Sequence, residues 1–387
     1  MKKKIIFLNG HMKTGGVEKS LLDILRHFDY EKYDVDLLLL EEGDDYLSEI
    51  PEHVNLIHKP LTSTYGAFLS SIRNCIKKRD YICLVIRICI LLSKWTKRSY
   101  NLIARVLLGK KKYDCAIAFR IGICGDLTAY GIWAKKKFLW WHHGEVSLNQ
   151  SQIAHQMQVF KEMDKIIAVS ESCREEFLKS FPIDEKVSVL SNMIDAAQIR
   201  FKAAMHNPYA SQPNIIHIVS VSRIAPEKHF ENVVYATEIL LSKGLNKFIW
   251  HVVGGDYDYE KICDMVVQHN LTDYIHMEGS QPNPYPYMKY ADLFVHPSYV
   301  ESQGLVVLEA MTLGVPCVVT RSLGPCEFIE DGVNGILTEQ SAESLAEKVN
   351  DILNDHNELK NIRNKTCCPI RFSPINIISQ IESLIES

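Results

Sequence analysis

The chain has 387 residues, more than one domain of ordinary size holds, so two domains are expected. Apolar residues make up 47% of the sequence, which supplies two cores and excludes a disordered chain. The net charge of −4 hides an asymmetry: residues 1–190 carry 29 Lys and Arg against 23 Asp and Glu, whereas residues 191–387 carry 14 against 24.

The chain begins with MKKKIIFLNG, a basic segment followed by a short apolar one. Because the apolar run ends at Asn9-Gly10, we expect a first buried strand and not a secretion signal. The 11 cysteines show no metal-type Cys-x-x-Cys spacing. Reduced thiols of a cytoplasmic protein are the simplest interpretation.

Short apolar segments then alternate with amphipathic ones. The expected strands of the first half are 4–10, 35–40, 55–58, 113–119 and 135–141, with further strands near 166–170 and 186–190. Gly15 and Gly16 lie between the first strand and the first helix, where a glycine pair lets the backbone approach a ligand. An ordinary tight loop is the alternative, since the dinucleotide spacing G-x-G-x-x-G is absent.

Residues 73–112 form the most basic segment, with Asp80 as its single acid. Apolar residues are interleaved, but the longest apolar stretch contains Arg87 and is too short to span a bilayer. We expect helices lying on an anionic membrane surface; a core helix with a solvated basic face is the alternative. Nucleic-acid binding is not expected, because no recognition motif accompanies the charge. The basic residues are Arg73, Lys77, Lys78, Arg79, Arg87, Lys94, Lys97, Arg98, Arg105, Lys110, Lys111 and Lys112.

His142 and His143 follow the expected strand 135–141. A histidine at the carboxyl end of a parallel strand lies on the ligand side of an open α/β sheet. A hydrogen-bonded loop residue is the plain alternative for either one. A metal is not expected here, because no carboxylate or cysteine stands at helical spacing from the pair.

The polar stretch 202–214 is the expected domain boundary, and strand and helix patterns resume after it. Between strand NIIHIVSVS and the next helix, Arg223 can bind two oxygens of one anion and Lys228 supplies a mobile charge. The alternative is that Arg223 and Lys228 are unrelated surface charges with no ligand in common.

The stretch ESQGLVVLEAMTLGVP, residues 301–316, predicts a glycine turn, a helix and its end at Gly314. Gln303, Gly304 and Leu305 then lie at a helix N-terminus, where backbone N–H groups favour a phosphate. The carboxylates of Glu301 and Glu309 suit sugar hydroxyls, although solvated helix charges are the bland alternative.

These stretches resemble the retaining glycosyltransferases of family 4. The resemblance covers the C-terminal half and, more thinly, residues 4–20 and 138–146. It implies an α/β fold of GT-B type, with two doubly wound Rossmann-like domains facing one interdomain cleft. The expected domains are an acceptor-binding domain at 1–205, a nucleotide-sugar domain at 206–370, and a helix at 371–387 that crosses back to the first domain. The family's usual turn, Gly-Phe-Gly, is Ser302-Gln303-Gly304 here.

The resemblance also implies roles for individual residues. Glu301 would contact the donor sugar and Glu309 the ribose, while His143, with His142 as the alternate, would line the sugar. Arg223 and Lys228 would neutralise the donor diphosphate. The implied catalytic set is Glu301, His143, Arg223 and Lys228, and the implied donor-binding residues further include Gly15, Gly16, Gly254, Glu278, Gly279, Asn283, Tyr285, Gln303, Gly304, Leu305 and Glu309.

The expected activity is that of a hexosyltransferase-type enzyme that moves a sugar from a nucleotide-sugar, a UDP-sugar, to a hydroxyl of a lipid-linked or glycan acceptor. Capsule or lipopolysaccharide O-antigen synthesis is the role that this resemblance implies, at the cytoplasmic face of a membrane. No metal and no tightly bound cofactor are expected. Two alternatives stay open: a nucleotide-sugar epimerase of the same general fold, and a non-catalytic glycosyltransferase-like subunit.

Overall fold

The computed structural model describes residues 2–43, 45–59, 68–93, 96–144 and 148–387 and divides the chain into two compact units. Unit 1 comprises Met1–Met193 and Pro374–Ser387, and unit 2 comprises Ile194–Ser373. The sequence placed the division between residues 205 and 206, later than the structure does. Helix α8 (Ala196–Ala203) accounts for the difference, because its buried Ile199 and Ala203 join a core of unit 2.

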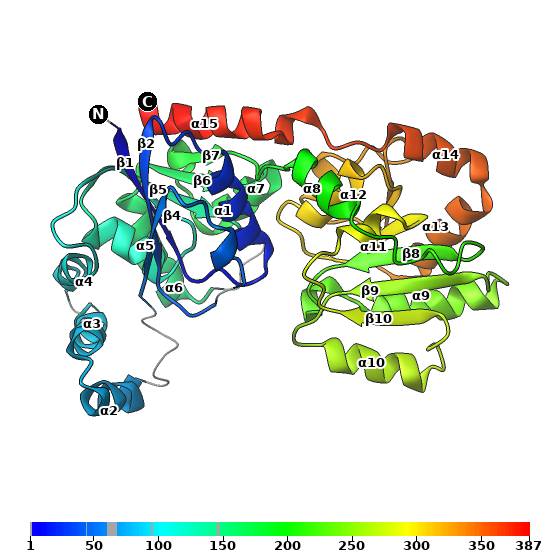
Figure 1. Ribbon diagram of the computed structural model, residues 1–387, viewed down its shortest axis with the longest axis horizontal. Coiled ribbons are helices and arrows are strands. Elements are labelled where there is room, and N and C mark those ends of the chain that lie inside the picture. Colours follow the sequence, from blue (N-terminus) through cyan, green and yellow to red (C-terminus); the bar gives the residue numbers. More distant parts are fainter. Residues whose placement is uncertain (1, 44, 60–67, 94–95, 145–147) are drawn as a thin grey trace. The chain divides into compact units, whose positions relative to one another are not determined.

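Unit 1 is built on a seven-stranded parallel sheet in the order β3-β2-β1-β4-β5-β6-β7 (Figure 1). Its strands are largely buried because helices cover both faces, as a parallel sheet requires. The bounds are β1 (Lys3–Asn9), β2 (Tyr33–Leu39), β3 (Val54–His58), β4 (Tyr113–Ala118), β5 (Ala134–Trp141), β6 (Lys165–Ala168) and β7 (Val187–Val189).

Besides α15 at the end of the chain, six helices in the described part of unit 1 have regular α geometry over ten or more residues. They are α1 (Gly16–His27), α2 (Phe68–Lys78), α3 (Tyr81–Leu92), α4 (Arg98–Leu108), α6 (Gln150–Lys161) and α7 (Glu171–Ser180), and the short α5 (Ile123–Asp126) runs into a π-helical turn. Several begin at side-chain caps: Ser170 accepts from the backbone N–H of Cys173, and Asn149 with Gln152 forms a capping box.

The last helix, α15 (Pro374–Glu386), belongs to unit 1 although it ends the chain. It buries Ile377, Ile381 and Ile385 in the core of unit 1; these residues recur every four positions and so form one helix face. The Tyr33 hydroxyl donates to Glu386 at 3.1 Å and fixes the end of the helix.

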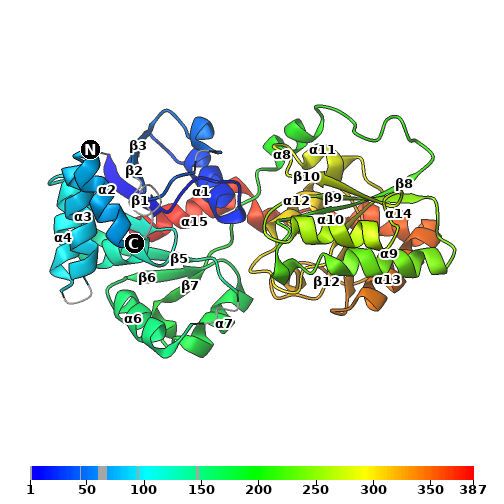
Figure 2. The same ribbon diagram turned by 90° about the horizontal axis from the view of Figure 1, so that it is seen from below.

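Unit 2 repeats the same architecture with a six-stranded parallel sheet in the order β10-β9-β8-β11-β12-β13 (Figure 2). Its strands are β8 (Ile216–Val221), β9 (Phe248–Val253), β10 (Ile275–Gly279), β11 (Leu293–His296), β12 (Cys317–Thr320) and β13 (Ile336–Thr338). Its remaining helices are α9 (Glu231–Ser242), α10 (Tyr259–Gln268), α11 (Tyr285–Lys289), α12 (Leu305–Thr312), α13 (Ala342–Asn354) and α14 (His356–Lys365).

The order of the strands reverses once in each sheet, between β1 and β4 in unit 1 and between β8 and β11 in unit 2. In an open parallel sheet the connections leave in opposite directions at this point, and a crevice opens at the carboxyl ends of the two strands. Ligand-binding residues are therefore expected directly after β1 and β4 in one unit, and after β8 and β11 in the other.

Helices α2, α3 and α4 pack side by side at one edge of unit 1 (Figures 1 and 2). The outer face of α3 is apolar, since Tyr81, Val85, Ile88 and Leu92 are all exposed and recur at helical spacing. Arg87, which the sequence counted with the basic surface, is buried on the opposite face of α3. Within the described ranges, no helix is long and apolar enough to cross a membrane. Lys94 lies outside those ranges.

Candidate active site

The main cluster of charged side chains in unit 2 lies at the reversal between β8 and β11. The Nζ of Lys228 lies 2.7 Å from the Oε1 of Glu301, and the Nε2 of His296 lies 2.6 Å from the same oxygen. Lys228 ends the short 3-10 turn after β8 (Pro226–Lys228), and His296 is the last residue of β11. Both side chains therefore reach Glu301 from the two strands that flank the crevice.

The Glu301 carboxylate is held ionised by its neighbours. Burial alone would raise its pKa, but the ammonium of Lys228 and the hydrogen bond from His296 outweigh burial and hold the pKa well below its usual range. The Nδ1 of His296 has no hydrogen-bond partner in the described part of the chain, so the tautomer with a hydrogen on Nε2 fits the contact. The cluster thus presents one fixed negative charge and one adjacent positive charge.

Arg223 is the second residue after β8 and is half exposed. Its guanidinium lies 3.3 Å from the Oε1 of Glu227 and 3.4 Å from the Oδ2 of Asp256. These long, exposed ion pairs contribute little stability, so the guanidinium can exchange them for a stronger anion.

The turn that follows Glu301 is tightly packed. Gly304 precedes α12 with a φ of 78°, and a Cβ there would lie 2.8 Å from the Cγ of Pro325. The backbone N–H of Gly324 donates to the carbonyl of Glu301 at 3.2 Å, and a Cβ on Gly324 would lie 2.4 Å from the Cα of Gln303. Residues 323–325 therefore pack tightly against the turn. Helix α12 begins at Leu305, so its N-terminus lies at the same edge of the sheet.

The second glutamate of the motif is buried. Glu309, in α12, accepts a hydrogen bond from the Tyr285 hydroxyl at 3.2 Å and is therefore not a solvated helix charge. Asn283, just before α11, donates to the backbone carbonyl of Lys202 at 2.9 Å.

Glu278 and Gly279 end β10, where Glu278 lies 2.8 Å from the Nδ1 of His251. Gly254 follows β9 with its Cα so close to the carbonyl of Ser222 that no Cβ fits. These positions lie at the carboxyl ends of β9 and β10, next to the Lys228–Glu301 cluster in strand order.

Gly15, Gly16 and the two histidines belong to unit 1. A Cβ on Gly15 would lie 2.6 Å from the Oε2 of Glu18, so the glycine allows this carboxylate to fold back over the start of α1. Glu18 is buried and pairs with Arg120, the second residue after β4. This ion pair therefore spans the β1–β4 reversal of unit 1.

The histidines follow β5. The ring of His142 packs on Phe119, with 4.7 Å between centroids, and burial with the charges of His143 and Arg120 lowers its pKa to about 3. His143 packs edge-on against Trp141, and burial with the charge of Arg120 lowers its pKa as well. Both imidazoles are therefore neutral at physiological pH and can donate or accept one hydrogen bond each.

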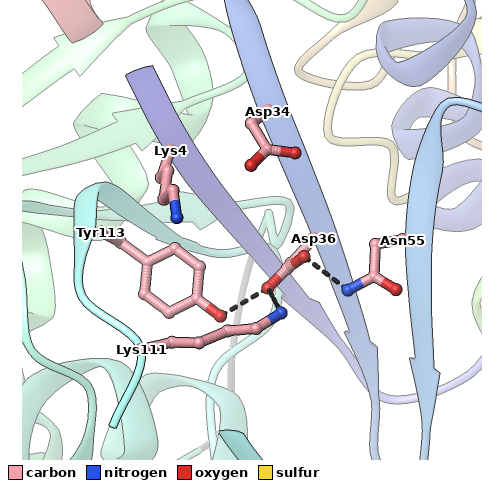
Figure 3. Close-up of a pocket in the computed structure, with 6 residues that line it drawn as sticks. All are labelled: Lys4, Asp34, Asp36, Asn55, Lys111 and Tyr113. Carbon is pink, nitrogen blue, oxygen red and sulfur yellow. Dashed lines mark hydrogen bonds and ion pairs between the residues drawn. The ribbon is translucent and has the colours of Figure 1, made fainter. Parts of the chain in front are cut away.

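A pocket of about 200 Å³ lies at the opposite edge of the unit 1 sheet (Figure 3). There the Asp36 carboxylate accepts hydrogen bonds from Lys111, Tyr113 and Asn55 at 2.6–2.7 Å. The pocket opens where β1 to β4 begin, and the ligand side of such a sheet is where the strands end. We therefore assign these residues to the stability of unit 1.

His296 and Arg120 were missed by sequence reasoning. His296 lies at the carboxyl end of a strand, five residues before Glu301. The same position relative to a strand singled out His142 and His143, so this feature of the sequence could have identified His296. No local pattern identifies Arg120, because its partner Glu18 lies far away in the sequence, in the first turn of α1.

The fold and these sites define a class: two doubly wound parallel α/β units with charged residues at their strand reversals, the GT-B arrangement. HepE of Anabaena, solved with UDP and glucose, shares this fold with a TM-score of 0.75 at 19% identity, over 99% of each chain. TarM of Staphylococcus aureus has a TM-score of 0.75 at 14% identity, over 100% of this chain and 99% of its own.

Two family models match consecutive parts of the chain: Glycosyltransferase Family 4 over residues 14–198, and Glycosyl transferases group 1 over residues 202–366. The chain belongs to the family 4 glycosyltransferases.

Curated relatives agree with this family. The poly(ribitol-phosphate) alpha-N-acetylglucosaminyltransferase of Staphylococcus aureus (strain COL) is 26% identical over 227 residues, 55% of this chain and 44% of its own. The N-acetyl-alpha-D-glucosaminyl L-malate synthase of Bacillus anthracis is 28% identical over 233 residues, 58% of this chain and 60% of its own. The matches therefore span less than two thirds of the length of either relative.

Proposed function

We propose that this protein transfers a sugar from a UDP-sugar to a hydroxyl of a lipid-linked or glycan acceptor in cell-surface polysaccharide synthesis, with retention at the anomeric carbon. The observation that carries the proposal is the largely buried Glu301 carboxylate, 13% exposed and fixed between Lys228 and His296 beside the N-terminus of α12. Two further observations support a UDP-sugar donor: the family of the chain, and the UDP present in the solved structures of HepE and TarM.

The charges of the cluster suit each part of such a donor. The ionised Glu301 accepts hydrogen bonds from sugar hydroxyls, and its low pKa keeps it an acceptor. Arg223 and Lys228 neutralise the diphosphate, and the backbone N–H groups at Gly304 and Leu305 add further donors. Glu309 accepts hydrogen bonds from the ribose, with Tyr285 holding its carboxylate.

In the proposed step, the bond between the anomeric carbon and the diphosphate oxygen breaks, and its electron pair leaves with UDP. The acceptor hydroxyl oxygen forms the new bond on the same face of the sugar, and its proton passes to the departing phosphate. The charge that develops on the phosphate is stabilised by Arg223 and Lys228, so the step needs no metal. His143, neutral at physiological pH, orients the transferred sugar.

We further propose that α2, α3 and α4 bind the anionic inner face of a membrane, where a lipid-linked acceptor is found. The exposed apolar stripe of α3 is adjacent in sequence to the exposed Lys77, Lys78 and Arg79, a combination that suits the boundary between headgroups and acyl chains.

Radiolabelled UDP-sugars with a lipid-linked acceptor test the activity directly. Glu301→Ala is expected to abolish transfer while circular dichroism stays that of the wild type. Glu339→Ala, which removes an exposed partner of Arg321, is the control and retains transfer. Near-normal turnover by Glu301→Ala would reject the proposed role. Chromatography of the nucleotide pool identifies an epimerase, which would convert the donor without any acceptor.

A further inference from the structure

A chain of three hydrogen bonds crosses the interior of unit 2 through β8, β9 and β10. The Nε2 of His217 lies 3.1 Å from the backbone carbonyl of Gln212, and its Nδ1 lies 3.0 Å from the Nε2 of His251. The Nδ1 of His251 then lies 2.8 Å from the Oε1 of Glu278. His217 and His251 are 4% exposed each, and Tyr209 stacks on the ring of His217 and packs at a tilt against that of His251.

This chain needs one more hydrogen than its members supply. Both ends, the carbonyl of Gln212 and the carboxylate of Glu278, can only accept. Two neutral imidazoles provide two hydrogens for three contacts. If His217 donates to Gln212 and His251 donates to His217, the bare Nδ1 of His251 faces the bare carboxylate oxygen of Glu278. In this arrangement the contact between His251 and Glu278 lacks a hydrogen, and either one further proton or a metal cation completes it.

His276 stands at the same point. It lies two residues before Glu278 in β10 and directly beside His251 in the register of β9 and β10. Its ring is perpendicular to that of His251, with 5.4 Å between centroids. The ligand atoms of His251, His276 and Glu278 all lie within 4.8 Å of one another. A tetrahedral ion with ligands about 2.0 Å away places these atoms about 3.3 Å apart, so the side chains would close in on a bound ion.

We propose that His251, His276 and Glu278 form a binding site for a zinc-type divalent cation. A metal between His251 and Glu278 completes the hydrogen-bond count: His251 donates its other ring hydrogen to His217, and His217 donates to Gln212. Such an outer partner fixes the tautomer and orientation of a metal-ligating histidine.

The donor set selects the class of ion. Two imidazole nitrogens and one carboxylate favour Zn²⁺ and its neighbours in the transition series, whereas Mg²⁺ prefers oxygen ligands. His276 is partly exposed and gives the ion access from solvent. Glu278 is also one of the residues that the family resemblance implies for donor binding, but no step of the proposed transfer reaction needs a metal at this site.

Zinc content and affinity of the full chain test the proposal. After chelation and dialysis, the wild type is expected to take up about one Zn²⁺ per chain by mass spectrometry of the metal, and Co²⁺ is expected to give the visible bands of tetrahedral coordination. His276→Ala removes one ligand without touching the His217–His251 contact, and Zn²⁺ should bind it ~100-fold more weakly. Its melting temperature without metal shows whether it folds.

His269→Ala is the matched control, because His269 makes the same 2.8 Å contact with a glutamate, Glu238, on the surface of unit 2. This variant is expected to bind Zn²⁺ as the wild type does. The proposal is overturned if the wild type retains no Zn²⁺, since a proton then fills the place between His251 and Glu278. It is also overturned if folded His276→Ala and the wild type bind Zn²⁺ equally.

Discussion

Glu301 is a largely buried carboxylate that contacts both Lys228 and His296 in unit 2. Its pKa lies below that of a free glutamate because Lys228 and His296 outweigh burial. The unfolded chain therefore takes up a proton at a higher pH than the folded chain. The stability that Glu301 contributes is present above its unfolded pKa, about 4.5, and is lost as the pH falls from there through the lower folded pKa.

Glu301→Gln tests this linkage because glutamine keeps the shape and loses the charge. At pH 7 the variant should be less stable by about 2 kcal/mol, since Lys228 is left partly buried without its partner. Urea unfolding at pH 7, 5.5 and 4 measures the difference, which should stay constant down to pH 5.5 and shrink at pH 4. A difference that grows toward pH 4 would contradict the assigned ion pair.

His142 is a base, whereas Glu301 is an acid, but both make the folded protein less stable as the pH falls. Its folded pKa, lowered to about 3, is far below the usual 6.5, so the unfolded chain binds a proton first as the pH falls. The wild type should lose stability from pH 6.5 toward pH 4, and His142→Gln should lose less over this interval. Equal slopes for the two proteins would show that His142 is solvated in the folded state.

At the scale of elements, the entry into α12 depends on one glycine. Gly304→Ala places a Cβ against Pro325 in a backbone conformation that alanine disfavours, so we expect a loss of about 2 kcal/mol or more in urea unfolding. Gly314→Ala is the matched control, because its φ of 71° is similar but no atom lies within 4 Å of the added Cβ. It should cost about 1 kcal/mol. Equal losses of stability in the two variants would mean that Pro325 moves aside and the contact with the added Cβ costs nothing.

The second element prediction concerns α2, α3 and α4. Replacing Lys77, Lys78, Arg79, Lys97 and Arg98 by glutamate should abolish co-sedimentation with acidic liposomes, because each basic residue adds about 1 kcal/mol to such binding. Replacing Ile82, Val85 and Ile88 by serine should weaken it at high salt as well. Val267→Ser, in unit 2, controls for loss of an exposed apolar side chain. Unchanged binding by the charge-reversed variant would show that these helices do not bind an anionic membrane through their basic residues.

At the scale of the whole molecule, much of the fold could be predicted from the sequence. The strand and helix patterns are local, and the glycine turn and helix of residues 301–316 follow from residue types alone. The inward turn of Arg87 could not be predicted, because the buried face of α3 depends on its neighbours. The His217–His251–Glu278 chain was missed for the same reason: three strands bring its members together, and no spacing along the chain marks them.

The central claim is that the chain binds a UDP-sugar through the Glu301 cluster, and thermal unfolding with a nucleotide panel tests it most directly. The wild type is measured with UDP, GDP, ADP and their common sugars, beside Arg223→Ala. At about 100 times its dissociation constant a ligand adds roughly 2.7 kcal/mol of stability, a shift of several degrees. We predict a shift with UDP or a UDP-sugar that Arg223→Ala largely loses. A shift with GDP or ADP alone, or with none of the panel, would contradict the account.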